Sequence, residues 1–405
     1  MNKVVLGGAM GCTAAIGSAT SVVVTLSFVW AVIRLARRDF PLTRVPEARI
    51  LALVMALFFG VEAFCGMISY NGLPTLSEII RNFVFLSFLP LYSRLSVSSR
   101  EGSRDALETG AVIGAFAALV LSIYQLLFLH HRAEGGAGNA VPFAVAALVG
   151  YTILWLGCMR ADGRRRLVLA AALCASGACV LFSGTRALWP GLLLVPVVVG
   201  LIYRKHFLTR RFGRAAAILL VAATCIGIVA AGFVEKRVEL AIKDVTASFS
   251  SNDYSGSFGR RLLIWRVGVK LVKEAPIFGQ GPGNARPLLE TGTAALGERL
   301  KYSHYHDVFL TYAVRDGIFG VLVVLAMILA PLILAARHER DEIGTYGLAL
   351  LAGVETAFLL SGAIGIMFGH DILDALFMIS MTTGAYLVFG STPGAEAYSR
   401  GQPPK

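Results

Sequence analysis

The chain has 405 residues, of which 56% are hydrophobic and only 15% are charged, where a soluble protein carries about 25% charged residues. This composition excludes an ordinary soluble domain, and continuous apolar runs of about twenty residues exclude a closed β-barrel and indicate membrane-crossing helices. The net charge of +12 is compatible with nucleic-acid binding. With no soluble domain to bind a nucleic acid, we assign it to basic cytoplasmic loops.

The apolar runs predict an all-α, polytopic membrane protein with about twelve transmembrane helices. The first run, Val4–Ile33, is either one long tilted helix or two short helices broken near Gly17, and the two-helix interpretation brings the total to twelve. The other predicted spans are Ile50–Tyr70, Glu78–Leu95, Ala106–Leu129, Val141–Met159, Leu167–Gly184, Ala187–Tyr203, Ala215–Phe233, Gly317–Ala336, Tyr346–Met367 and Ile372–Gly390.

Lysines and arginines alternate between successive short loops, and this alternation predicts the orientation. The basic loops are 34–49, 94–104, 160–166, 204–214 and 337–340. The short loops between them carry few such residues: 71–77 has none, and the loop after Leu129 has only Arg132. By the positive-inside rule these loops are cytoplasmic, and Arg186 faces the periplasm. The chain then divides into N-terminal transmembrane helices (1–233), one large periplasmic loop (234–305), C-terminal transmembrane helices (306–390) and a cytoplasmic tail (391–405) that we expect to be disordered.

The periplasmic loop has its own pattern. Val234–Val245 predicts an amphipathic helix on the membrane surface, Ser248–Gly259 a flexible linker, and Arg260–Lys273 a second amphipathic helix that ends before Pro276. A glycine-rich turn, residues 279–283, follows. Eleven basic and seven acidic residues between positions 235 and 301 favour an anionic partner. A solvated loop beside anionic lipid is the alternative. The second helix carries a basic stripe of Arg266, Lys270 and Lys273.

His306 lies where this loop re-enters the membrane. If the span is Gly317–Ala336, residues 306–316 form an interfacial helix on which His306 and Gly317, about three turns apart, share a face. Asp307 is placed to orient the imidazole as a base, although a single histidine near an interface is more often structural. His304 would point about 200° away on the same helix.

Charged residues inside predicted spans include Glu62, Arg81 and Glu355. Intramembrane charges are functional candidates by default. Glu62 and Arg81 both lie towards the outer side, so they either form a structural pair with each other or contribute to a site there.

Three sequence pieces occur in order between Leu167 and Gly320. They are Ser183-Gly184-Thr185-Arg186-Ala187, then Arg261-x-x-x-Trp265 with Pro276-x-x-Gly279-x-Gly281-Pro282-Gly283, and then His306-x10-Gly317. In these pieces the chain resembles the O-antigen ligase and O-antigen polymerase superfamily of bacterial inner-membrane glycosyltransferases. The remaining helices resemble the family only in number and length. The family often has Asn after the histidine, where this chain has Asp307.

The resemblance implies a GT-C-like fold and an undecaprenyl-pyrophosphate-linked glycan as donor, with a site that faces the periplasm. The acceptor would be lipid A-core oligosaccharide for a ligase, or another lipid-linked repeat for a polymerase. The implied roles are His306 as base and cations on the donor pyrophosphate, chiefly Arg186 and Arg261 and, more weakly, Arg260 and Arg266. Supporting positions are Asp307, Arg81 and Gly317.

We expect an inverting reaction without cofactor, and without metal because the outer loop has no Asp-x-Asp pair. The His306–Gly317 spacing and the single extended loop favour a ligase over a polymerase. A transporter of lipid-linked sugars is the alternative of another class. It would require internal repeats, broken helices and mid-membrane charges, and the sequence shows no repeat.

Overall fold

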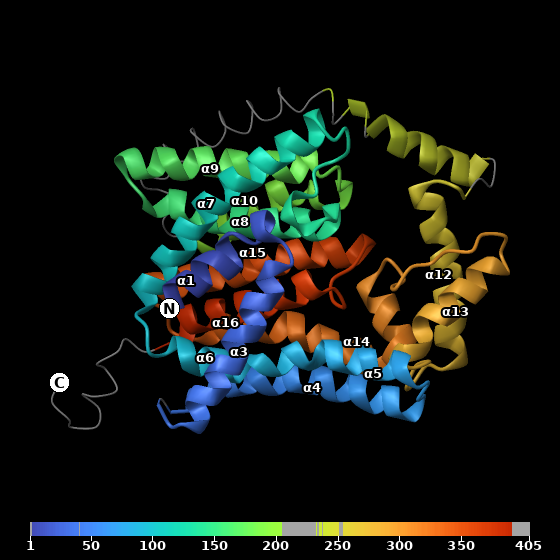
Figure 1. Cartoon of the computed structure of the whole chain (residues 1–405), viewed down its shortest axis with the longest axis horizontal. Coiled ribbons are helices and arrows are strands. Elements are labelled where there is room, and N and C mark those ends of the chain that lie inside the picture. Colours follow the sequence, from blue (N-terminus) through green and yellow to red (C-terminus); the bar gives the residue numbers. More distant parts are fainter. Residues whose placement is uncertain are drawn as a thin grey trace.

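The computed structural model describes residues 2–39, 41–204, 232, 235–236, 238–250 and 254–390. These residues form helices and no β-strand, which confirms the all-helical prediction. Eight of the described helices are long and apolar enough to cross a membrane. They are α3 (Ala19–Ala36), α4 (Pro46–Ile68), α7 (Arg100–Leu127), α8 (Ala140–Arg160), α9 (Gly163–Phe182), α14 (Val308–Arg337), α15 (Glu342–Ile364) and α16 (Asp371–Phe389), seen together in Figure 1.

Other predicted spans take a different form or lie outside the described residues. The predicted span Glu78–Leu95 is broken into α5 (Leu73–Arg81), the 3₁₀ segment η2 (Asn82–Ser87) and α6 (Phe88–Leu95). The span predicted after Ala187 is the shorter α10 (Gly191–Ile202), preceded by η4 (Arg186–Leu188). The span predicted at 215–233 lies almost entirely outside the described residues, so a total of twelve stays a prediction.

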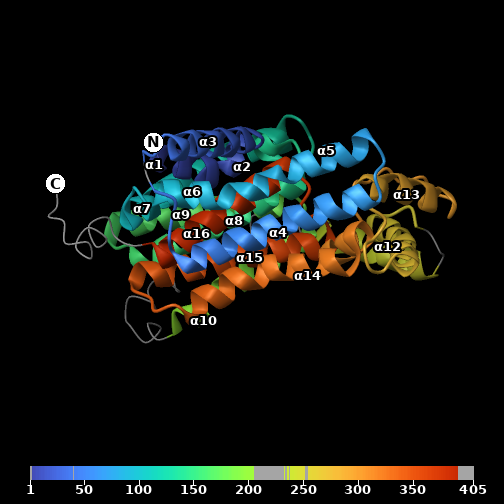
Figure 2. The same ribbon diagram turned by 90° about the horizontal axis from the view of Figure 1, so that it is seen from below.

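The first apolar run is broken at Gly17, as the two-helix interpretation requires. It forms α1 (Asn2–Leu6), a π-helical turn η1 (Gly7–Gly11) and α2 (Thr13–Ile16), and α3 then folds back across them (Figure 2). Gly17 has φ 55°, and a Cβ at this position would lie 1.9 Å from the carbonyl oxygen of Gly136. The close approach of η3 (Gly135–Ala137) therefore requires glycine at the break.

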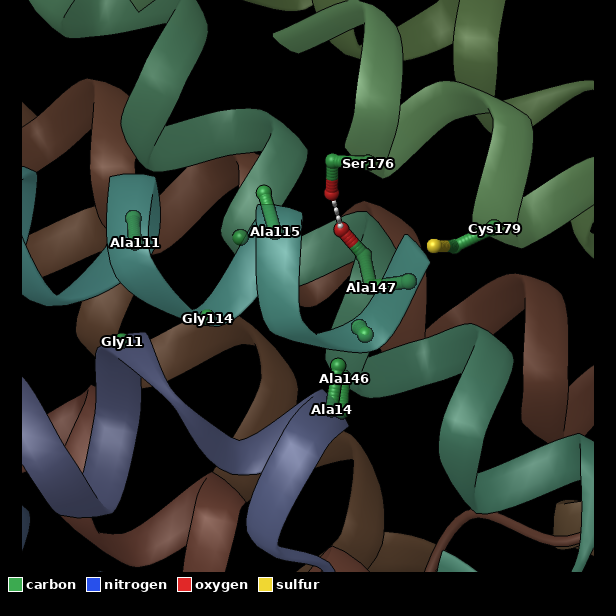
Figure 3. A pocket seen from close by; sticks show the side chains of 11 residues that line it. Gly11, Ala14, Ala111, Gly114, Ala115, Ala146, Ala147, Ser176 and Cys179 are labelled. Carbon is green, nitrogen blue, oxygen red and sulfur yellow. Dashed lines mark hydrogen bonds between the residues drawn. The ribbon is translucent and has the colours of Figure 1, made fainter. Parts of the chain in front are cut away.

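Small residues let this first segment pack closely on its neighbours. A Cβ on Gly11 would lie 2.5 Å from the backbone of Gly110 in α7, and one on Gly114 would lie 2.3 Å from Gly11. Figure 3 shows the small side chains where α2, α7, α8 and α9 meet, around a void of about 10 Å³. Such contacts are typical of helices that associate inside a membrane, where small residues allow the backbones to approach.

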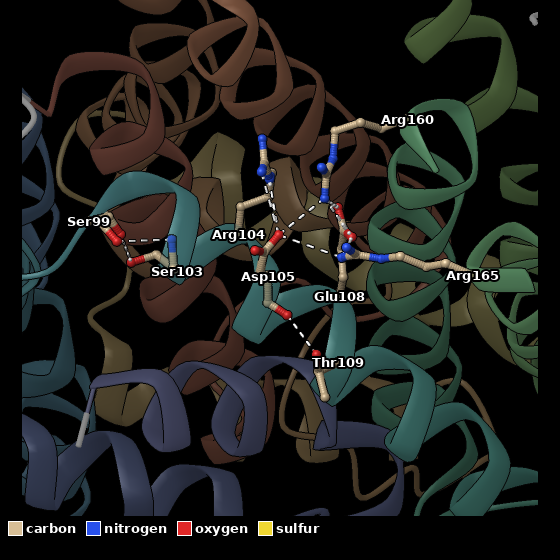
Figure 4. A network of polar contacts seen from close by, with 9 residues as sticks. Ser99, Ser103, Arg104, Asp105, Glu108, Thr109, Arg160 and Arg165 are labelled. Carbon is tan, nitrogen blue, oxygen red and sulfur yellow. Dashed lines mark hydrogen bonds and ion pairs between the residues drawn. The ribbon is translucent and has the colours of Figure 1, made fainter. Parts of the chain in front are cut away.

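Successive connections gather alternately at the two ends of the bundle. At the end opposite α12 and α13, Arg100 donates to Asp341 at 2.9 Å. At the same end, the buried Glu108 accepts from Arg160 and Arg165 at 3.1 and 2.7 Å, as Figure 4 shows. At the other end, the backbone N–H of Ala133 donates to Phe182. This pairing of loops confirms the alternation inferred from the basic residues, while the side of the membrane that each end faces stays a prediction.

The segment predicted as the periplasmic loop stands at one end of the bundle (Figures 1 and 2). Residues 238–250 are helical, and they are followed by α12 (Ser257–Glu274) and α13 (Pro282–Ala294). The predicted linker is shorter than expected, because the Asp244 carboxylate accepts from the N–H of Phe258 at 2.8 Å and ties the two helices together. A small core of its own holds this region, formed by Ile264, Val267, Leu271, Ala285, Leu289, Leu300, Tyr305 and Val314.

Candidate functional site

The segment from Tyr302 to His306 brings two histidines together. The rings of His304 and His306 have centroids 4.4 Å apart, and the ring of Tyr302 lies 4.7 Å from that of His306. Tyr305 points the other way, is 1% exposed and donates from its hydroxyl to the carbonyl oxygen of Ala285 at 2.9 Å. Burial of Tyr305 between the histidines therefore holds them on one side of the segment.

The expectation that His306 lies on a helix is wrong. His306 has φ 54° and precedes α14, which begins at Val308. The Asp307 carboxylate accepts from the N–H of Leu310 at 2.7 Å, so it caps the helix and satisfies one of its free donors. The structure therefore gives Asp307 a capping contact in place of the predicted contact with the imidazole. The prediction that His304 points away from His306 is wrong for the same reason.

Gly317 does not share a helical face with His306, because α14 is kinked at Gly317 (φ 64°, ψ −147°). A Cβ at Gly317 would lie 2.2 Å from the carbonyl oxygen of Ile277, so only glycine permits this approach. The glycine-rich turn docks on the kink through backbone hydrogen bonds, from Gln280 N–H to Val314 at 2.7 Å and from Gly281 N–H to Arg315 at 2.9 Å. Gly317 thus positions the loop and α14 relative to each other.

Two arginines of the sequence motifs meet near the histidines. Arg186 opens η4, after a turn in which the Ser183 hydroxyl accepts from the N–H of Thr185 at 3.1 Å. Arg261 lies on α12, one turn before Trp265. Burial and the positive charge of Arg186 both lower the pKa of Arg261, so the two guanidinium groups sit close enough to repel each other. We call Arg186, Arg261, His304 and His306 the arginine–histidine cluster.

Both histidines of the cluster are neutral at neutral pH. Burial, together with the positive charges of Arg261 and His370, lowers the pKa of His304 to about 4. Burial also lowers the pKa of His306 to about 3, assisted by His304 and Arg261. A neutral imidazole can accept a proton, which a charged one cannot.

Several buried polar atoms of the cluster and of the neighbouring Trp265 have no hydrogen-bond partner among the described residues. They are Nε of Arg261, Nε1 of Trp265 and Nδ1 of His306. Buried polar groups in native proteins are almost always hydrogen-bonded, so unsatisfied atoms that share one place require an explanation. A polar ligand that binds between α12 and the segment before α14 would satisfy them.

The two weaker arginine candidates point to other partners. Arg260 is exposed and lies 3.8 Å from the Glu298 carboxylate. Arg266 donates to the Tyr254 hydroxyl at 3.3 Å, and its guanidinium lies 5.3 Å from the centre of the same ring. Neither is drawn into the cluster by a contact that the structure describes.

Sequence reasoning missed the ion pairs beside the site. Arg315 of α14, which we had not considered, donates to Glu62 at 3.0 and 2.6 Å and to Glu78 at 3.0 Å. The expected pair between Glu62 and Arg81 is therefore wrong, and Arg81 lies 2.9 Å from Glu78. We call Glu62, Glu78 and Arg315 the buried ion network. One feature of the sequence could have predicted this network, namely that Arg315 is charged and lies only two residues before the predicted span.

His370 was also missed. It immediately precedes α16 and its Nδ1 lies 3.1 Å from the Asp371 carboxylate. Burial and the charge of Arg81 lower its pKa, whereas Asp371 raises it, and its own charge acts on His304. His370 therefore lies next to the cluster, and Arg81 lies near His370. A histidine beside an aspartate in a predicted outer turn was the available signal.

Comparison with known proteins covers the same part of the chain. Residues 169–325 match the family model described as O-antigen ligase. This range contains Arg186, Arg261, His306 and Gly317 and excludes Arg81. A Haemophilus influenzae protein described as uncharacterized is 31% identical over 159 residues, which are 37% of this chain and 38% of that protein. The chain thus spans well under half of the curated relative that it matches.

The family match and the motifs agree in position. The three sequence pieces that suggested the resemblance fall at residues 183–187, 261–283 and 306–317, all inside the matched range. The match therefore confirms the resemblance inferred from the motifs: residues 169–325 of this chain are similar to the O-antigen ligase family.

Proposed function

We propose that this protein is an O-antigen ligase of the bacterial inner membrane, which transfers an undecaprenyl-pyrophosphate-linked O-antigen glycan to lipid A-core oligosaccharide on the periplasmic side. The observation that carries the proposal is the arginine–histidine cluster, which combines two repelling arginines with neutral histidines and unsatisfied buried donors. A site of this kind should bind most tightly a ligand that is strongly anionic at one end. The GT-C-like fold and the four-part division of the chain belong to the same proposal.

Arg186 and Arg261 hold the donor pyrophosphate in this proposal. A guanidinium binds phosphate oxygens in a forked, bidentate geometry and never loses its charge near neutral pH. Without a ligand the two positive charges repel each other, and a diphosphate that lies between them relieves this repulsion. Arg81 stays a supporting position, since it lies near His370 but is already paired with Glu78.

His306 accepts the proton of the acceptor sugar hydroxyl. The hydroxyl oxygen forms the new bond to the anomeric carbon, the bond from that carbon to the phosphate oxygen breaks, and the pyrophosphate leaves with the electron pair. Attack from the face opposite the leaving group inverts the anomeric centre, and no cofactor or metal enters the proposed step. The pKa of His306 in the empty site is too low for an efficient base, since such a base works best with a pKa near the operating pH. The negative charge of the bound pyrophosphate would raise it.

Two features of the structure favour the transporter alternative. The segment α5–η2–α6 and the helix α14 are broken, and charged residues lie between them. Broken helices and buried charges are features of transporters. Here, however, the guanidinium of Arg315 is paired with the carboxylates of Glu62 and Glu78, and Glu78 is also paired with Arg81. We therefore favour the transferase, in agreement with the family match.

A reconstituted assay separates the remaining alternatives. The full chain in proteoliposomes is given polyprenyl-pyrophosphate-linked glycan and either lipid A-core oligosaccharide or a second lipid-linked glycan. Transfer to lipid A-core supports the ligase, and elongation of the lipid-linked glycan alone identifies a polymerase. Movement of intact donor across the bilayer without transfer would refute both.

The same assay tests His306. His306→Ala should lower turnover by roughly 10² to 10⁴-fold at saturating donor, the usual contribution of a general base. His131→Ala, at an exposed position at the same end of the bundle, serves as the matched control and should leave turnover unchanged. Near-normal turnover of His306→Ala would show that His306 is not the base.

A further inference from the structure

An apolar groove lies between α12 and α14. Its volume is about 400 Å³, within the range of roughly 300–1,000 Å³ that is typical of ligand pockets. The small side chain of Ala313 leaves room between the larger residues. The lining residues are Val269 and Val272 of α12, and Phe309, Leu310, Ala313 and Val321 of α14, with Lys273 at the edge.

The surroundings of the groove indicate what fills it. α14 is one of the helices apolar enough to cross a membrane, and α12 lies against its first half (Figure 2). Beside the groove, Ile318 and Leu322 expose 48% and 54% of their surface, and Val269 exposes 47%. Apolar side chains exposed on a membrane-crossing helix face hydrocarbon. A groove that opens there is therefore open to lipid chains.

The three residues of the basic stripe on α12 differ in their contacts. Arg266 is bound to Tyr254, and the Lys270 ammonium lies 3.9 Å from the Glu274 carboxylate. Lys273 is exposed and forms no ion pair with any residue that the structure describes. The one cation of the stripe that touches the groove is thus also the one that is left to bind an anion.

We infer that this groove binds an acyl chain of an anionic membrane phospholipid, with the lipid phosphate on Lys273. A chain fills the apolar lining between Val269 and Ala313, and the headgroup reaches the ammonium at the edge. Lysine near a membrane surface attracts anionic lipid, and its apolar stem can lie along the acyl chain.

In this inference the lipid whose phosphate lies on Lys273 is distinct from the donor of the proposed transfer reaction. Lys273 follows Arg261 by twelve residues on one helix, so the two positions are separated by about 18 Å along its axis. A single pyrophosphate cannot lie on both cations. The groove therefore serves a second lipid, which would hold α12 against the membrane beside the site.

Photolabelling tests the inference on the full chain in nanodiscs. Phosphatidylglycerol and phosphatidylcholine that carry a diazirine on the acyl chain are used as probes, and labelled peptides are mapped by mass spectrometry. Phosphatidylglycerol should label residues 269–273 and 309–321 in preference to phosphatidylcholine. Lys273→Glu should lower this labelling at least about fivefold, and the matched control Lys270→Glu should change it little, because Lys270 does not line the groove.

A second variant tests the apolar part. Ala313→Phe fills the groove and should reduce labelling by both probes, and the surface variant Lys273→Glu remains informative if Ala313→Phe fails to fold. Equal labelling by the two headgroups, or no loss in Lys273→Glu, would overturn the inference. Displacement of the probe by polyprenyl pyrophosphate would overturn it in favour of the donor chain, and this result is distinct from any loss of transfer activity.

Discussion

Two groups of ionisable side chains lie at the same end of the bundle and differ in how they are partnered. In the buried ion network, Arg315 is 6% exposed and Glu62 is 1% exposed, and their guanidinium and carboxylate groups are joined at 2.6 Å. In the arginine–histidine cluster, Arg261 lies near another arginine and near histidines that burial keeps neutral. The charges of the buried ion network are paired with one another, whereas a bound anion would stabilise the arginine–histidine cluster.

This difference separates residues that stabilise the fold from residues that act on a ligand. Breaking a buried pair leaves an uncompensated charge, which strongly destabilises a protein. Removing one of two repelling cations leaves no such charge behind. The two groups should therefore respond in opposite ways to the same kind of substitution, in stability and in binding.

The largest effect is expected in the buried ion network. Glu62→Ala removes the closest partner of Arg315 and should lower the free energy of unfolding by about 3–5 kcal/mol, measured as a lower melting temperature in detergent. Glu339→Ala, at an exposed position, is the control. The distinction between the groups fails if Glu62→Ala and Arg261→Met melt at the same temperature.

The next effect is on donor binding. Arg261→Met should melt at or above the wild-type temperature, because burial and Arg186 already disfavour its charge. It should weaken binding of polyprenyl pyrophosphate by about 10- to 100-fold, since a hydrogen bond to a charged group contributes about 1.5–3 kcal/mol. Arg186→Lys should not restore full binding, because lysine lacks the forked geometry. Arg266→Met, which loses only its contact with Tyr254, should bind as the wild type does, and equal weakening in Arg266→Met would contradict the assignment.

The sequence predicted the membrane class, the alternation of the loops and three members of the arginine–histidine cluster, namely Arg186, Arg261 and His306. These depend on hydrophobic runs, charge counts and motif order, which are properties of the chain itself. It also predicted α12 and the break at Gly17. The prediction failed where a single side-chain contact decides between two local structures.

The region around His306 illustrates this. The spacing to Gly317 fits a helix that begins at His306, but capping by Asp307 starts α14 two residues later, at Val308, and the docked glycine turn kinks it at Gly317. Likewise, the choice of Arg315 over Arg81 as partner of Glu62 depends on how α14 packs on α4, which no local pattern encodes. Tertiary contacts, more than propensity, set these details.

A third effect concerns the pH dependence of catalysis. In the free enzyme, burial and the charges of His304 and Arg261 hold the pKa of His306 at about 3. A bound pyrophosphate should raise it by roughly 1–2 pH units, as a charge about 6 Å away does in a medium of intermediate dielectric constant. As pH falls, kcat should therefore decline before kcat/KM, which reports the free enzyme. If kcat and kcat/KM begin to fall at the same pH, the pyrophosphate lies far from His306.

The smallest effect is the pH dependence of stability in the empty protein. The folded-state pKa values of His304 and His306 are about 4 and about 3, and an unfolded histidine titrates near 6.5. Between these values the unfolded chain binds protons that the folded chain rejects, so stability is complete above about pH 6.5 and declines as pH falls. The melting temperature of the empty protein should thus drop between pH 7 and pH 5, where most carboxylates stay ionised. The double variant His304→Gln/His306→Gln should flatten this slope, and saturating polyprenyl pyrophosphate should flatten it in the wild type. An unchanged slope in the double variant would show that these rings are solvated in the folded protein. The arginine–histidine cluster would then no longer differ from the buried ion network by its neutral, buried histidines.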